Sequence, residues 1–92
     1  MRSGWKGFLK LVHGAEDEKQ LNELFDLLLT LEERAMLEKR MHIIHDLLQG
    51  DFSQREIAEK HHLSIAAITR GSNALKLIHQ RLKEYVQQCL ID

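Results

Sequence analysis

Residues 53–76 of this 92-residue chain read SQREIAEKHHLSIAAITRGSNALK, and they predict two short helices joined by a tight turn. Ser53 is a favourable N-cap, and Glu56 three residues later completes a capping box. The helical pattern breaks at residues 61–63, after which Ser64 can cap a second helix. A helix of about eight residues, a short turn and a second helix form a helix-turn-helix, whose second helix enters the major groove of DNA.

Side chains within this segment agree with that arrangement. Ile57 and Ala58 are expected to face inward, and the small Ala58 suits a close crossing by the second helix. The predicted apolar stripe of the second helix consists of Ile65, Ile68 and Leu75. His62 occupies the corner, where many such turns have glycine because the backbone often takes a positive φ, and histidine tolerates this better than most residues.

The rest of the chain predicts an all-α fold of six helices in a single domain, residues 1–92. There is no proline, and the apolar residues recur at helical rather than strand spacing. Helices are expected at residues 4–13, from a second capping box at Thr30 to about Gln49, and from 80 to about 90. A further helix is expected to follow the acidic run 16–18 and to carry Leu21, Leu24, Phe25 and Leu28 on one face. So small a chain would leave apolar stripes uncovered, which favours an intertwined or side-by-side homodimer.

Positive charge is concentrated on the predicted helix-turn-helix. The net charge of the chain is −1, but residues 53–83 carry six Lys or Arg against two Glu, a local charge of +4. Phosphates are bound locally, so this distribution is compatible with a nucleic-acid partner despite the acidic total.

Other features narrow the functional class. The single Cys89 cannot form an internal disulfide, no export signal is evident, and the apolar run 27–29 is too short for a membrane, so a cytoplasmic protein is expected. The six histidines lack the spacing of a zinc site, and surface positions are the ordinary interpretation. Without a catalytic arrangement of Ser, Cys, His or Asp, the sequence predicts neither an enzyme nor a cofactor.

Arg40 and Arg70 have two interpretations. The third helix is expected to have a broad apolar face, made of Met36, Leu37, Ile43, Ile44, Leu47 and Leu48. Arg40 interrupts this pattern, and Arg70 lies among small polar residues. Both could be solvated or contact phosphate. They could instead frame a small anionic or aromatic ligand, since guanidinium groups stack on rings and bind carboxylates.

The central fifty residues resemble the tryptophan-operon repressor family. The match rests on Glu33-Arg34, Arg40, Leu47-Leu48-x-Gly50, Ser53-Gln54-Arg55-Glu56 and, above all, Ile-Thr-Arg-Gly-Ser-Asn-x-Leu-Lys at 68–76. The resemblance implies an interlaced six-helix homodimer that binds L-tryptophan as corepressor and then double-stranded operator DNA. It further implies repression of genes for tryptophan biosynthesis or uptake.

The resemblance also assigns residues. In the family the indole lies between arginines matching Arg40 and Arg70, and Arg70 holds the ligand carboxylate with help from Thr30. Backbone carbonyls matching Leu27 and Leu29 of the other subunit hold the amino group. Further pocket positions match Gly71 and Asn73. For DNA, Arg55 matches the residue that reaches a guanine edge. The tip of the reading helix matches Ile65, Ala66 and Thr69, and phosphate-side positions match Gln54, Ser72, Asn73 and Lys76.

The chain departs from the family pattern at four positions. The pocket threonine is Ala67 and the serine that helps to bind the amino group is Ala74, while a lysine of the first motif helix is Ala58 and the glycine of the turn is His62. The loss at Ala74 removes a hydrogen bond of roughly 1 kcal/mol. Two alternatives remain open: a repressor of this fold that is ligand-independent or responds to another small molecule, and a helical protein-interaction module.

Overall fold

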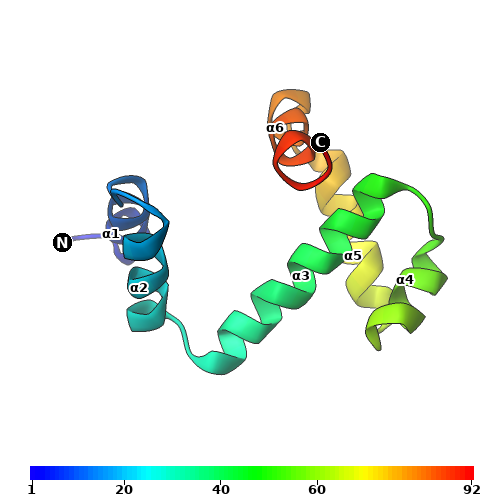
Figure 1. Ribbon diagram of the computed structural model, residues 1–92, viewed down its shortest axis with the longest axis horizontal. Helices are drawn as coiled ribbons and strands as arrows, with labels where there is room; N and C mark the ends of the chain where they lie inside the picture. The colour runs from blue at the N-terminus through cyan, green and yellow to red at the C-terminus, as the bar shows by residue number, and fades with distance from the viewer. The chain divides into compact units, whose positions relative to one another are not determined.

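The structure is a computed structural model that describes all residues, 1–92, and contains six α-helices and no strand (Figure 1). The helices are α1 (Gly4–His13), α2 (Glu18–Leu28), α3 (Leu31–Gln49), α4 (Gln54–His61), α5 (Ile65–Leu77) and α6 (Gln80–Leu90). The predicted all-α class and the predicted helix order are therefore confirmed. No helix combines the length and the apolar character needed to cross a membrane.

The chain forms two compact units, residues 1–34 and residues 35–92. In the first unit the side chains of Ser3 and Asp17 cap α1 and α2. Aromatic rings join the two helices: Trp5 stacks on Phe8 with centroids 5.3 Å apart, and Phe8 lies 6.3 Å from Phe25. Trp5 nevertheless keeps 68% of its surface exposed, so these contacts do not make it a core residue of a single chain.

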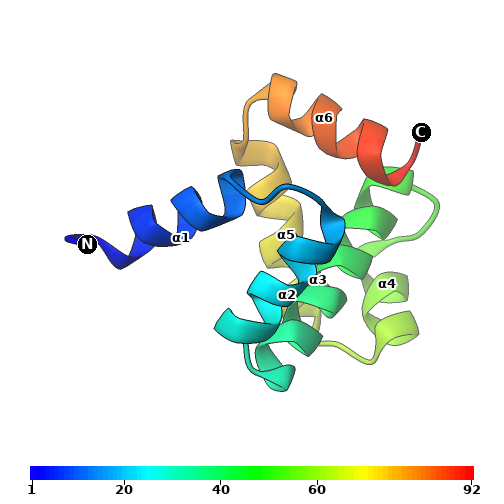
Figure 2. The same cartoon turned by 60° about the vertical axis from the view of Figure 1, so that its left-hand side comes forward.

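The second unit has a small core. Its buried apolar residues are Ile43 from α3, Ile57 and Ala58 from α4, and Ile68 from α5. The helix α5 crosses α3 in both ribbon views (Figures 1 and 2), and α4 contributes the two side chains that fill the corner between them. The predicted inward positions of Ile57 and Ala58 are confirmed.

The helix-turn-helix forms as the sequence predicts. Ser53 Oγ accepts a hydrogen bond from the Glu56 amide, and Glu56 Oε1 accepts one from the Ser53 amide, at 3.1 and 3.0 Å. Hydrogen bonds from the backbone amide and then the side chain of Ser53 lower the pKa of the Glu56 carboxyl. His62 takes the left-handed conformation with φ 55°, and the Leu63 amide donates to the Ala58 carbonyl at 2.9 Å. Ser64 then caps α5.

Two packing expectations fail in the single chain. Ile65 was expected in the apolar stripe of α5 but is 49% exposed, because it lies in the first turn, before the helix reaches the core at Ile68. The apolar face expected on α3 is buried or half-buried only from Ile43 onward, and its first two residues, Met36 and Leu37, are exposed. Apolar spacing identifies a face, but burial requires another element to cover it.

Gly71 lies where α5 passes closest to α3. A Cβ at this position would lie 3.0 Å from Ile43 Cγ2 and 3.5 Å from Leu47 Cδ1. A methyl group here therefore meets Ile43, a buried residue of the core.

We expect Gly71→Ala to destabilise the protein by about 1 kcal/mol. The gain in helix propensity is about 1 kcal/mol, whereas overpacking a core costs about 1 to 3 kcal/mol. Urea unfolding measures the difference. Ile43→Leu removes the obstructing Cγ2 with little change in volume, so the pair Gly71→Ala/Ile43→Leu should be more stable than Gly71→Ala alone. A stabilised single variant contradicts the close approach of the two helices.

Candidate ligand pocket and nucleic-acid surface

Three side chains near the start of α5 are exposed to solvent. Ile65, Ala66 and Thr69 are exposed, as a helix that reads base edges requires. Thr69 Oγ1 donates a hydrogen bond of 3.0 Å to Gln54 Oε1, which joins the start of α4 to α5. Arg55 follows Gln54 in α4, and its side chain is exposed. The structure thus links two of the predicted DNA-contacting residues directly.

The second half of α5 carries the predicted phosphate-side residues. Asn73 and Lys76 are exposed, while Ser72 is half-buried. All three follow Arg70 on the same helix, so a partner along α5 would meet them in succession.

A cavity of about 420 Å³ lies behind α5. Arg40 of α3 and Arg70 of α5 both line it, as do Ala67, Gly71 and Ala74. Ile43, Leu75, Ile78 and Val86 are among the apolar residues of its wall. Its volume is in the usual range for small-molecule pockets. Lys39 also lines it, and three cationic side chains in an otherwise apolar wall suit a ligand that combines a ring with an anionic group.

Other predicted ligand residues lie outside this cavity. Asn73 is on α5 but does not line it. Thr30, Leu27 and Leu29 belong to the first unit. Thr30 has a clear local role, because its Oγ1 accepts from the Glu33 amide at 3.1 Å and Glu33 Oε1 accepts from its own amide at 3.0 Å. The second predicted capping box is therefore confirmed.

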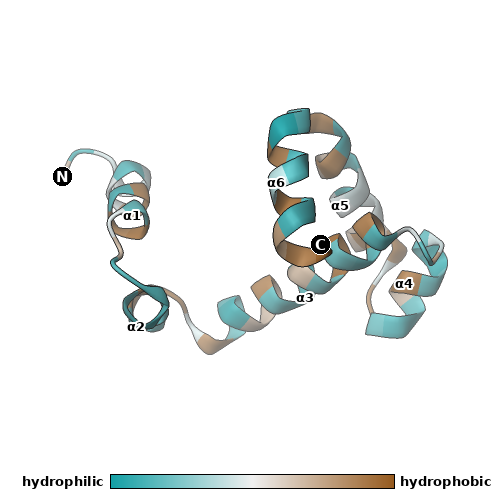
Figure 3. Ribbon diagram, turned by 45° about the horizontal axis from the view of Figure 1, so that its top comes forward, coloured by the Kyte–Doolittle hydropathy of each residue, from teal (hydrophilic) through white to brown (hydrophobic).

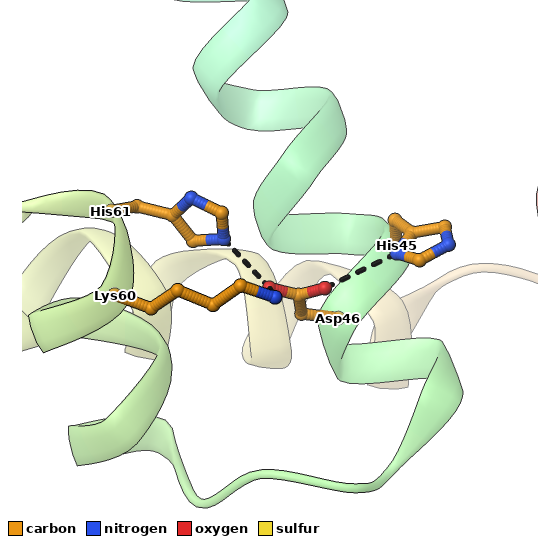
Figure 4. A network of polar contacts seen from close by, with 4 residues as sticks. All are labelled: His45, Asp46, Lys60 and His61. Atoms are coloured by element: carbon orange, nitrogen blue, oxygen red, sulfur yellow. Dashed lines mark hydrogen bonds and ion pairs between the residues drawn. The ribbon is translucent and has the colours of Figure 1, made fainter.

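Asp46 forms a polar cluster that the sequence did not predict (Figure 4). This α3 residue is only 5% exposed, and its carboxylate contacts His61 Nε2 at 2.6 Å, His45 Nδ1 at 3.2 Å and Lys60 Nζ at 3.3 Å. The histidines of this cluster were expected to be ordinary surface residues, yet the His61 side chain is only 18% exposed. One signal was available: Asp46 follows Ile43 by three residues and so shares its inward face.

Burial alone raises the pKa of the Asp46 carboxyl, but hydrogen bonds from His61, His45 and Lys60 outweigh it and lower the pKa from 3.8 to about 2. This carboxyl therefore stabilises the fold fully above about pH 4, and the contribution is lost as the pH falls through about 2. The shift corresponds to about 2 kcal/mol of unfolding free energy.

We expect the stabilising contribution of the Asp46 carboxylate to appear as a difference in unfolding free energy between wild type and Asp46→Asn. Urea unfolding of both proteins at pH 6 and pH 3 measures it. The advantage of the wild type should shrink by about 1 kcal/mol at pH 3, since about half of the contribution is lost there. Asp51→Asn, an exposed neighbour, is the control. An advantage that stays constant with pH would contradict a depressed pKa for Asp46.

Comparison with known proteins decides the family. The sequence profile described as Trp repressor protein matches residues 3–90. The chain belongs to the Trp repressor family. Such a match covers all six helices, so the relationship extends beyond the helix-turn-helix on which the sequence resemblance mainly rested.

Individual Trp repressor relatives agree with this assignment. A Trp operon repressor homolog of Chlamydia trachomatis serovar D is 51% identical over 86 residues, which cover 94% of this chain and 92% of the relative. Homologs of the same description from Chlamydia caviae and Vibrio cholerae are each 42% identical. They cover 92% and 97% of this chain, and the matches span 84% and 86% of those proteins. The chain is thus a transcription regulator of the Trp repressor family.

Proposed function

We propose that this chain represses transcription as a homodimer that binds operator DNA when L-tryptophan occupies the cavity behind α5. The main support for the proposal is that α3 and α5 both line this cavity, α3 with Arg40 and α5 with Arg70. The same helix α5 also presents the exposed side chains proposed to read DNA. A ligand there touches the helix that meets DNA. The genes controlled are those of tryptophan biosynthesis or uptake, and the site of action is the cytoplasm.

The ligand contacts follow from the cavity and from the family resemblance. Arg40 and Arg70 sandwich the indole, and Arg70 also binds the carboxylate. Gly71 also lines the cavity, next to Arg70 on α5. The resemblance adds Asn73, Thr30 and the backbone carbonyls of the partner subunit's Leu27 and Leu29.

The proposed DNA contacts are of two kinds, to base edges and to phosphates. Arg55 binds a guanine edge, a contact that a guanidinium makes with two hydrogen bonds. Ile65, Ala66 and Thr69 contact base edges at the tip of α5. Phosphate contacts are made by Gln54, Ser72, Asn73 and Lys76, and these fix the orientation of the protein on the duplex.

Exposed apolar surface supports the homodimer. Several large apolar side chains keep more than half of their surface in solvent in the single chain: Trp5, Leu27, Leu31, Met36, Leu77 and Tyr85. Apolar residues recur along one side of α1 and α6 (Figure 3), as helices that cover a partner require. Burying these faces in a second copy removes them from water and also completes the set of ligand contacts.

The proposed mechanism is a population shift. Without the ligand the two reading helices sample several orientations. L-tryptophan, held between α3 and α5, favours the orientation in which the two helices enter successive major grooves about 34 Å apart.

Calorimetric titration of L-tryptophan tests the ligand, because Trp5 complicates a fluorescence assay. We expect saturable binding near one ligand per chain, a dimer by sedimentation, and operator affinity that rises with L-tryptophan. Absence of heat at millimolar ligand and at two temperatures would reject the corepressor assignment.

A second candidate is a repressor of this fold that answers to another small molecule or to none. The observation that favours it is that Ala67 and Ala74, which replace hydroxyl-bearing family residues, both line the cavity. Operator binding that is strong and unaffected by L-tryptophan would select this candidate. A DNA affinity that does not fall with salt would instead favour a protein-interaction module.

A further inference from the structure

The Asp46 cluster joins the ligand-bearing helix to the end of the first motif helix. Asp46 lies on α3, six residues beyond Arg40, whereas Lys60 and His61 are the last two residues of α4. None of the proposed ligand or DNA contacts uses this buried carboxylate. Its side chain is 6% exposed, so three polar partners surround a group that water barely reaches.

The contact is made at the point where the chain changes direction. His61 ends α4, His62 takes the left-handed conformation with φ 55°, and α5 begins three residues later. The His61–Asp46 distance of 2.6 Å is the shortest in the cluster. Only His62, whose backbone is strained, and two further residues separate His61 from α5. If His61 moved relative to α3, the start of α5 would therefore move as well.

We propose that Asp46 is a positioning residue for the DNA-reading helix. Through His61 it holds the end of α4 against α3 and thereby fixes the direction in which α5 leaves the turn. This role rests on the proposed function, because it concerns the fit of α5 to operator DNA.

Charge and hydrogen-bond geometry explain why a carboxylate serves here. An ionised carboxylate only accepts hydrogen bonds, so both contacting imidazoles and the Lys60 ammonium can donate to it at once. Two further groups hold these partners: His42 of α3 stacks on His61 with centroids 5.4 Å apart, and the Phe52 ring lies 4.8 Å from Lys60 Nζ. An asparagine amide at position 46 would turn a donor toward other donors.

Asp46→Asn, His61→Gln and the double variant test the proposal, with Asp51→Asn as a control of equal charge change. We expect each single variant to lose about tenfold or more in affinity for an operator fragment at saturating L-tryptophan. Affinity for random DNA should change less than about threefold, because phosphate contacts do not need a fixed direction of α5. The double variant should bind the operator fragment no less tightly than the single variant with the lower affinity, because the two substitutions remove the same Asp46–His61 contact.

Amide hydrogen exchange gives a readout that needs no DNA. In Asp46→Asn the Leu63 amide, which donates to the Ala58 carbonyl at 2.9 Å, should exchange about tenfold faster or more, while the core amides of Ile57 and Ile68 are affected less. Equal acceleration of all three amides shows general destabilisation and overturns the positioning role.

Failure of the proposed function and failure of the positioning role give different results. Wild-type protein that binds no operator with L-tryptophan present refutes the proposed function and, with it, this role in DNA binding. A wild type that binds, together with variants that keep wild-type operator discrimination, refutes the positioning role alone. If Asp46→Asn does not fold, as circular dichroism would show, His61→Gln decides by the same criteria.

Discussion

Replacement of Arg70 by alanine is expected to abolish the ligand-dependent part of operator binding. Arg70 reaches the cavity from the same helix that presents the proposed reading side chains. A paired guanidinium–carboxylate contact contributes two charge-assisted hydrogen bonds, so its loss should weaken L-tryptophan binding about a hundredfold or more. Calorimetry measures the ligand affinity, and operator binding with and without L-tryptophan measures the response.

Matched variants separate the ligand contact from charge. Arg70→Lys keeps the positive charge but not the planar fork, and we expect it to restore little of the ligand affinity. Arg81→Ala removes the same charge from α6, outside the cavity lining, and should leave L-tryptophan binding unchanged. A full response to L-tryptophan in Arg70→Ala would show that the ligand binds elsewhere.

Replacement of Arg55 by alanine is expected to reduce discrimination between operator and random DNA by roughly ten- to a hundredfold, the usual value of a bidentate contact with a base. Binding to random DNA should fall much less, because it depends on phosphate contacts. Arg55 is exposed at the start of α4, so the substitution leaves the core intact. Competition between operator and random duplexes at fixed salt and saturating L-tryptophan measures the ratio.

Lys76→Ala is the informative comparison for Arg55→Ala. A lysine that contacts phosphate contributes to all sequences alike, so its loss should weaken operator and random DNA equally and reduce the salt dependence by about one ion. If Arg55→Ala behaved in the same way, Arg55 would be a phosphate contact and the assignment to a base edge would be wrong.

Local structure was largely predictable from the sequence. Both capping boxes, at Ser53 and at Thr30, form with the predicted hydrogen bonds. His62 adopts the positive φ expected at the corner of the motif. These features depend on residues within a few positions of one another, and such short-range chemistry can be recognised without knowledge of the packing.

Burial was less predictable because it depends on elements that are distant in sequence. The carboxylate of Asp46 is buried only because α4, whose His61 lies fifteen residues further along the chain, closes over it. For the candidate site, the sequence suggested that Arg40 and Arg70 could frame one ligand, and the crossing of α3 and α5 at Gly71 is what places both on the lining of one cavity. Roles that the family resemblance assigns to individual residues stay predictions until the experiments above are made.

The small core of the second unit has a consequence for how the regulator works in a cell. Four buried apolar residues, Ile43, Ile57, Ala58 and Ile68, are little to hold a chain of this length folded. If the remaining stability comes from a second copy, folding and assembly are one event, and the folded fraction depends on protomer concentration. The number of copies per cell then becomes a regulatory quantity in its own right, and dilution during growth would relieve repression without any change in the ligand.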